Sequence, residues 1–125
     1  MKMEFSSAAP IYMQIMDEIK REIVSGERKP GSKVETVRDM AQSMGVNPNT
    51  VQRAFAQLER EGLMFTERTS GRYITADTKL IGTIKEESIM QNIAEFVGLM
   101  IKSGFSKADI LRLVKNYLEG DNSNG

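Results

Sequence analysis

The chain has 125 residues, of which 40% are hydrophobic and 27% are charged, which is typical of one globular domain with a small additional element. It contains no cysteine and no histidine, which excludes disulfides, Cys/His zinc sites, thiolate nucleophiles and imidazole bases. No catalytic residue, metal site or cofactor is therefore predicted. Lys plus Arg and Asp plus Glu each number 17, so any binding of nucleic acid must depend on where the charges are placed.

The location of the protein is indicated by its apolar segments. No run of residues is apolar enough to span a membrane, and the start MKMEFSSAAP lacks the apolar region of a signal peptide. The expected location is the cytoplasm, with no membrane partner.

The first predicted element is an amphipathic helix that begins at Pro10 and ends at Gly26. Its apolar residues recur at helical spacing, with charged residues between them: Tyr12, Ile15, Ile19 and Ile23. Residues 27–32 contain a Pro-Gly pair and are expected to form a turn.

The next segment predicts two short helices. Thr36 and Asp39 have the spacing of a capping box, and Gly45 ends the helix that they begin. Asn47 is a typical N-cap and Pro48 a typical first helical residue, so a second helix runs from there to Gly62. Two helices joined by a glycine-containing turn predict a helix-turn-helix.

A β-hairpin is predicted directly after these helices. Residues 63–66 and 72–75 favour strands, and the polar loop between them contains Gly71. A hairpin in this place forms the wing of a winged helix-turn-helix. Residues 76–84 are expected to be a connector.

Two further helices are predicted in the C-terminal part. The first has a wide apolar face and ends near Gly104, and the second begins at a capping box of Ser106 and Asp109 and ends near Gly120. Such faces need a partner surface, and a two-fold homodimer is the commonest solution. The predicted dimerisation residues are Ile89, Ile93, Phe96, Val97, Met100, Ile110, Val114 and Tyr117.

The predicted fold class is therefore mainly α with a small β-hairpin. Residues 1–78 are expected to form a winged helix-turn-helix domain that binds DNA, and residues 79–120 a two-helix dimerisation region. Residues 121–125 are expected to be a flexible tail.

The second helix of a helix-turn-helix lies in the major groove, which directs attention to the start of the helix after Asn47. Asn49, Thr50, Gln52 and Arg53 bear side chains that can contact bases or phosphates. The alternative is that Asn47 and Thr50 only cap the helix, and that Gln52 and Arg53 only face solvent. The preceding helix and the wing favour DNA contact, as does a local excess of basic residues between Arg28 and Arg38.

Several blocks of sequence, in order, resemble the GntR family of bacterial transcription regulators. They are Pro10-Ile-Tyr-Met-Gln-Ile15, Gly26-Glu-Arg-Lys-Pro-Gly31, Val37-Arg-Asp-Met-Ala41, Gly45-Val-Asn-Pro-Asn-Thr-Val51 and Leu58-Glu-Arg-Glu-Gly-Leu63. The short C-terminus is similar to the YtrA subfamily, whose members dimerise through it.

This resemblance implies DNA contact by Arg38, by the start of the recognition helix and by the wing glycine, Gly71. Pro48 and Gln52 stand where many members have arginine, and Glu35 where many have proline, so an operator sequence cannot be inferred from those relatives. The complete predicted DNA-binding set is Lys33, Thr36, Arg38, Asn47, Asn49, Thr50, Gln52, Arg53, Ser70, Gly71 and Arg72.

These observations predict a homodimeric repressor that binds a palindromic double-stranded DNA operator. The resemblance implies control of a transporter operon, and no residue identifies an effector. The alternative is a winged-helix module for protein interaction, which would need an exposed apolar patch on the winged half and a neutral or acidic face along residues 47–57. An enzyme is a third alternative, disfavoured because no side chains form a recognisable catalytic group.

Overall fold

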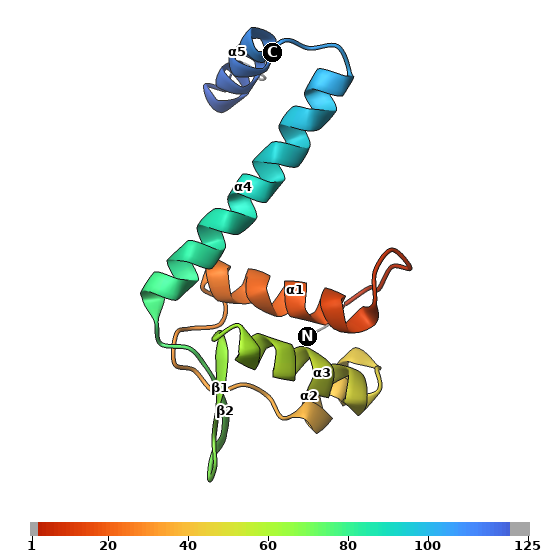
Figure 1. Cartoon of the computed structure of the whole chain (residues 1–125), viewed down its shortest axis with the longest axis vertical. Coiled ribbons are helices and arrows are strands. Elements are labelled where there is room, and N and C mark those ends of the chain that lie inside the picture. Colours follow the sequence, from red (N-terminus) through yellow and green to blue (C-terminus); the bar gives the residue numbers. More distant parts are fainter. Residues whose placement is uncertain (1–2, 121–125) are drawn as a thin grey trace. The chain divides into compact units, whose positions relative to one another are not determined.

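The computed structural model describes residues 3–120, and the predicted flexible tail 121–125 lies outside this range. The chain divides into two compact units, Met1–Lys85 and Glu86–Gly125. The elements are mainly helical with one hairpin, as predicted (Figure 1). In chain order they are α1 (Ile11–Ser25), α2 (Val37–Met44), α3 (Pro48–Arg60), β1 (Met64–Glu67), β2 (Gly71–Ile74), α4 (Thr78–Lys102) and α5 (Lys107–Leu118). Within the described range, no helix is both long and apolar enough to cross a lipid bilayer.

The core of the first unit is formed by α1, α2 and α3, with the inner side of the hairpin. Helix α3 packs against both α1 and α2. Its buried residues fall on one side of the helix at the predicted spacing, and the most buried large side chains of the core are Ile15, Ile19, Met40, Val51, Phe55, Leu58, Leu63 and Ile74. Burial of each such side chain stabilises the fold by about 1.5–3 kcal/mol, which fixes the orientation of α3.

Local capping residues set the end of α1, both ends of α2 and the start of α3, as predicted. Helix α1 ends at Gly26, which has a φ of 86°. The backbone N–H of Asp39 donates to Oγ1 of Thr36 across 3.0 Å, and that of Asn49 donates to Oδ1 of Asn47 across 2.7 Å. Gly45, with a φ of 71°, ends α2 and makes the turn to α3. The helix-turn-helix is confirmed.

The wing comprises β1, β2 and the turn at residues 68–70, in antiparallel register with Phe65 opposite Tyr73. The two rings stack with centroids 5.7 Å apart. Lys33 forms an additional bridge to Tyr73, so the segment before α2 lies beside the wing. This contact fixes the base of the wing to the helix-turn-helix.

The predicted connector over residues 76–84 is wrong, because α4 begins at Thr78. The backbone N–H of Leu80 donates to Oδ1 of Asp77 across 3.0 Å, which caps the first turn. Leu80, Ile81 and Ile84 pack against the core of the first unit. This tertiary contact outweighs the low helix propensity of a segment that contains glycine and threonine.

The second unit contains the rest of α4 and all of α5. The capping box is confirmed, since Ser106 accepts from the N–H of Asp109 across 3.1 Å and donates its own N–H to Oδ2 of Asp109 across 3.0 Å. Among the described residues of this unit, Ile110 is the buried hydrophobic side chain, with 7% exposed. Most of the other large apolar side chains here are exposed.

Candidate DNA-binding interface

The outer face of α3 carries the polar side chains predicted to contact bases. Asn49 and Gln52 are exposed: Asn49 lies opposite the buried residues of the helix, and Gln52 lies on its flank. Asn47 is also exposed and its side chain caps the helix, whereas Thr50 is half-buried. An exposed amide on this face can form the paired hydrogen bonds that adenine offers in the major groove.

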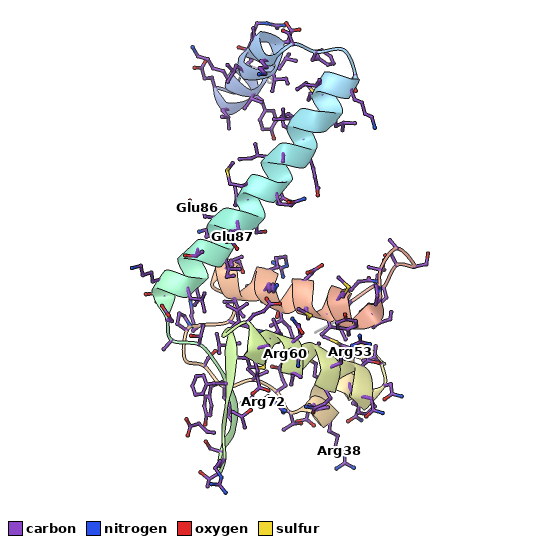
Figure 2. The ribbon with its side chains drawn as sticks, in the orientation of Figure 1. Arg38, Arg53, Arg60, Arg72, Glu86 and Glu87 are labelled. Carbon is purple, nitrogen blue, oxygen red and sulfur yellow. The ribbon has the colours of Figure 1, made fainter. Side chains whose placement is uncertain are left out.

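Arg38 is the exposed cation nearest the start of α2. Figure 2 shows its side chain extending away from the helix. Within the part of the chain that the structure describes, Arg38 makes no ion pair closer than 4.0 Å. Thr36, two residues before it, is exposed and caps α2. The charge of Arg38 is therefore available to a phosphate or a guanine.

Arg28 has a different role from the other basic residues of its segment. Its side chain is 11% exposed and forms ion pairs with Glu22 at 2.6 Å and Glu35 at 2.7 Å. Burial raises the pKa of Glu22, against the opposing hydrogen bond from Arg28, whereas the Arg28 guanidinium lowers the pKa of Glu35. Arg28 therefore stabilises the fold, and the local basic excess expected from the sequence is smaller than a count of residues indicates.

The wing places its predicted residues differently from one another. Ser70 and Gly71 are exposed, and the hydroxyl of Tyr73 donates to Oγ of Ser70 across 3.0 Å. Gly71 has a φ of 116°, and a Cβ at this position would lie 3.3 Å from Cε of Lys33. The exposed Lys33 side chain thus lies close to the backbone of the wing at Gly71, where the positive φ favours glycine.

Arg72 faces α3 instead of solvent. Its guanidinium carbon lies 5.3 Å from the centroid of the Phe55 ring, and its Nε lies 3.7 Å from Oε1 of Glu59. The Nε is buried and has no hydrogen-bond partner among the described atoms. Glu59 also accepts a hydrogen bond from Thr66 of β1. The arrangement joins the wing to the recognition helix.

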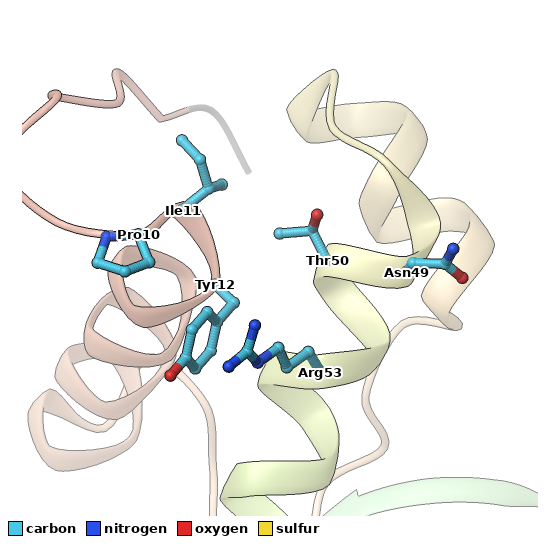
Figure 3. Close-up of a pocket in the computed structure, with 6 residues that line it drawn as sticks. All are labelled: Pro10, Ile11, Tyr12, Asn49, Thr50 and Arg53. Atoms are coloured by element: carbon cyan, nitrogen blue, oxygen red, sulfur yellow. The ribbon is translucent and has the colours of Figure 1, made fainter.

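Arg53 lies beside a shallow groove between the starts of α1 and α3 (Figure 3). Its guanidinium carbon is 4.0 Å from the centroid of the Tyr12 ring. The apolar spacing placed Tyr12 on the inner face of α1, and no local signal in the sequence indicates its contact with α3. Tyr12 is the candidate functional residue that sequence analysis missed.

A helix-turn-helix with an exposed polar recognition helix, followed by a two-stranded wing, defines the winged helix-turn-helix class of DNA-binding proteins. The family described as "Bacterial regulatory proteins, gntR family" matches residues 11–74. The chain belongs to this GntR family, and it is a helix-turn-helix transcription regulator and not an enzyme.

The relatives include regulators of similar length. The chain is 35% identical over 107 residues to the HTH-type transcriptional repressor YtrA of Bacillus subtilis, covering 86% of this chain and 81% of YtrA. A solved GntR family transcriptional regulator from Listeria monocytogenes is 38% identical, with a TM-score of 0.83 over 90% of this chain and 98% of that one. AraR(DBD), solved in complex with operator ORE1, is 27% identical with a TM-score of 0.52, covering 58% of this chain and 90% of AraR(DBD).

Proposed function

We propose that this protein is a repressor that binds a palindromic operator as a homodimer, with one recognition helix α3 in each half-site. The observation that carries the proposal is the outer face of α3, where Asn49 and Gln52 are exposed. The preceding helix α2 carries Arg38, which is exposed and has no ion pair among the described residues. Related proteins are a repressor, YtrA, and a domain in complex with operator DNA, AraR(DBD). A protein that binds the chromosome in this way acts in the bacterial cytoplasm.

In this proposal the interface residues divide by role. Asn49 and Gln52 contact base edges, and Arg38 contacts a guanine or a phosphate. The remaining predicted residues contact the DNA backbone or shape the surface that does so: Lys33, Thr36, Asn47, Thr50, Arg53, Ser70 and Gly71. Arg72, which lies against Glu59 and Phe55, holds the wing in position for these contacts.

The proposed dimer interface is the apolar surface of the second unit. Ile89, Ile93, Phe96 and Tyr117 are exposed, whereas Val97, Met100 and Val114 are half-buried and Ile110 is buried. The exposed surface also includes side chains that the sequence prediction did not name: Met90, Leu99, Ile101, Leu111 and Leu118. Apolar area of this extent is typical of a protein interface, and a second copy would cover it. Ile110 is 7% exposed in the single chain and so adds little to this exposed surface.

The proposed division of labour follows the chain, with residues 1–78 binding DNA and residues 79–120 forming the dimer. Helix α4 begins at Thr78 and continues into the second unit, so it connects the two functions. The proposal includes control of a transporter operon, which follows from the resemblance to YtrA-like regulators.

The experiment that tests this proposal is a mobility-shift titration with the DNA upstream of the protein's own gene, repeated over a range of salt concentrations. We expect a specific complex that survives an excess of unrelated duplex and weakens as salt rises. Sedimentation of the free protein should give the mass of two chains. Equal binding to upstream and unrelated duplexes at every salt concentration would contradict the proposal.

A protein-interaction module is the second candidate, and the winged half does not favour it. In the described part of the first unit, the exposed large hydrophobic side chains are Met13 and Phe65. They lie on different elements, α1 and β1, and Phe65 stacks on Tyr73. Two separated side chains do not form the contiguous apolar patch that such a module needs.

A further inference from the structure

Arg53 and Tyr12 form a contact between the recognition helix and the first helix of the domain. The guanidinium carbon of Arg53 lies 4.0 Å from the centroid of the Tyr12 ring, within the range of a cation–π interaction. Figure 3 shows the guanidinium against the ring, beside a groove lined also by Pro10, Ile11, Asn49 and Thr50. Tyr12 is half-buried and Arg53 is exposed. The half-buried ring therefore supports the exposed guanidinium.

The charge of Arg53 differs from that of most arginines in the first unit. Four of them are engaged by polar partners: Arg21 by Glu18 and Glu27, Arg28 by Glu22 and Glu35, Arg60 by Gln57, and Arg72 by Glu59. For Arg53 the structure gives, over residues 3–120, the tyrosine ring and no carboxylate within 4.0 Å. A ring binds the face of a guanidinium and leaves the N–H donors at its edge for another acceptor.

The position of Arg53 on α3 indicates which acceptor this is. Arg53 lies one turn after Asn49 on the exposed side of the helix, and the ring draws its side chain toward α1. Because the Tyr12 ring holds the guanidinium on the α1 side of α3, the charge lies to one side of the face that would enter the major groove, where a phosphate of the DNA backbone is the nearest acceptor. A guanidinium forms strong paired hydrogen bonds with phosphate oxygens.

We propose that Tyr12 is a positioning residue that holds the Arg53 guanidinium beside α3 for a phosphate of the operator backbone. This inference rests on the proposed function, since it adds α1 to the elements that determine DNA affinity. A guanidinium already held in place loses less conformational freedom when DNA binds. Removal of the ring therefore weakens DNA binding even though Tyr12 itself makes no contact with DNA.

The test is a double-mutant cycle on the full-length protein, with the upstream duplex and an unrelated duplex of equal length as probes. Dissociation constants are measured at several salt concentrations for the wild type, Tyr12→Phe, Tyr12→Leu, Arg53→Gln and the double variant. We expect Tyr12→Phe to match the wild type and Tyr12→Leu to bind about two- to five-fold more weakly. Arg53→Gln should lower the slope of log affinity against log salt by about 0.9, the value for one phosphate contact. Tyr12→Leu should have no further effect in the Arg53→Gln background.

The outcomes separate this inference from the proposed function. If Arg38→Ala weakens binding to the upstream duplex and Arg53→Gln does not, the proposed function stands and this inference is wrong. An equal effect of Tyr12→Leu with and without Arg53 would show that the ring acts on the fold alone, which also overturns it. If the wild type does not prefer the upstream duplex, the proposed function fails, and the salt slopes on the unrelated duplex still decide whether Tyr12 positions Arg53.

Discussion

The Nε of Arg28 donates to Oε1 of Glu22 across 2.6 Å, and both side chains are almost completely covered, with 11% and 12% exposed. Glu22 belongs to α1, and Arg28 also binds Glu35, which lies just before α2. The guanidinium thus joins the end of the first helix to the segment that leads into the helix-turn-helix.

Replacement of Arg28 by leucine should lower the free energy of unfolding by about 3–5 kcal/mol, because it leaves the Glu22 carboxylate buried without its partner. Denaturant unfolding at fixed protein concentration measures the loss. The double variant Arg28→Leu/Glu22→Leu should recover most of it, since no buried charge remains. The matched control is Arg21→Leu, because the Arg21 guanidinium is 53% exposed in its ion pairs and should change stability little.

Acid should weaken the same connection through Glu35. The hydrogen bond from Arg28 holds the pKa of Glu35 below its ordinary value of 4.5, so the native state is stabilised above pH 4.5, where the carboxylate is charged. As the pH falls below 4.5 toward the lowered pKa, the unfolded chain takes up its proton first and this contribution is lost. Glu35→Gln should therefore show a shallower loss of stability over this range than the wild type, measured by urea unfolding at each pH. Parallel curves would show that Glu35 adds nothing to the acid sensitivity.

The sequence predicted the first three helices and the hairpin because their ends are set by adjacent residues. Gly26, Gly45 and the Asn47-Pro48 pair cap or turn the chain locally, and a local pattern is what sequence analysis detects. The early start of α4 was missed because Leu80 and Ile84 gain their helical conformation from contact with the core. Tertiary contact overrides a weak local preference in that segment.

The chemical character of the site was harder to predict than its location. Helical periodicity places Asn49 on the side away from the buried Val51 and Phe55, and it places Gln52 on the flank between the two faces; both side chains are exposed. The partner of Arg72 comes from another element and is not evident from the spacing of residues. The same holds for the contact of Arg53 with Tyr12. A basic residue in the sequence therefore indicates a charge, and only the fold decides whether that charge is available to DNA.

The wing provides a third prediction. Gly71→Ala should lower the free energy of unfolding by about 1–2 kcal/mol, because a φ of 116° is strained for any residue with a side chain and the new Cβ would meet Lys33. DNA binding should weaken as well, because the wing and Lys33 shift together. The control is Gly82→Ala in α4, where nothing lies within 4 Å of the new Cβ and the helix should gain about 0.5–1 kcal/mol. Thermal unfolding of both variants measures the difference, and equal effects would contradict the argument.

The recognition helix provides a fourth. Gln52→Ala should weaken binding to the preferred operator by about 1–3 kcal/mol and reduce discrimination at a single base pair, because a bidentate amide contact specifies one base. Arg38→Ala should weaken binding by a similar amount. Fluorescence anisotropy with a set of operator variants measures both quantities. If the Gln52 variant bound every operator with wild-type affinity, its proposed role in base recognition would be wrong.

The fifth prediction concerns the proposed dimer interface on α4. Ile93 is 45% exposed, and its side chain belongs to the apolar surface that a second copy would cover. Ile93→Lys should give monomers in sedimentation, because the dimer would have to bury an unpaired ammonium group. The control Gln91→Lys adds the same charge two residues away, on the opposite side of the helix and within reach of Glu95, which Gln91 contacts at 3.1 Å. This control should remain dimeric. Operator affinity should fall steeply for Ile93→Lys and stay near wild type for Gln91→Lys, because two linked recognition helices bind two half-sites far more tightly than one. A dimeric Ile93→Lys variant would place the interface on another surface.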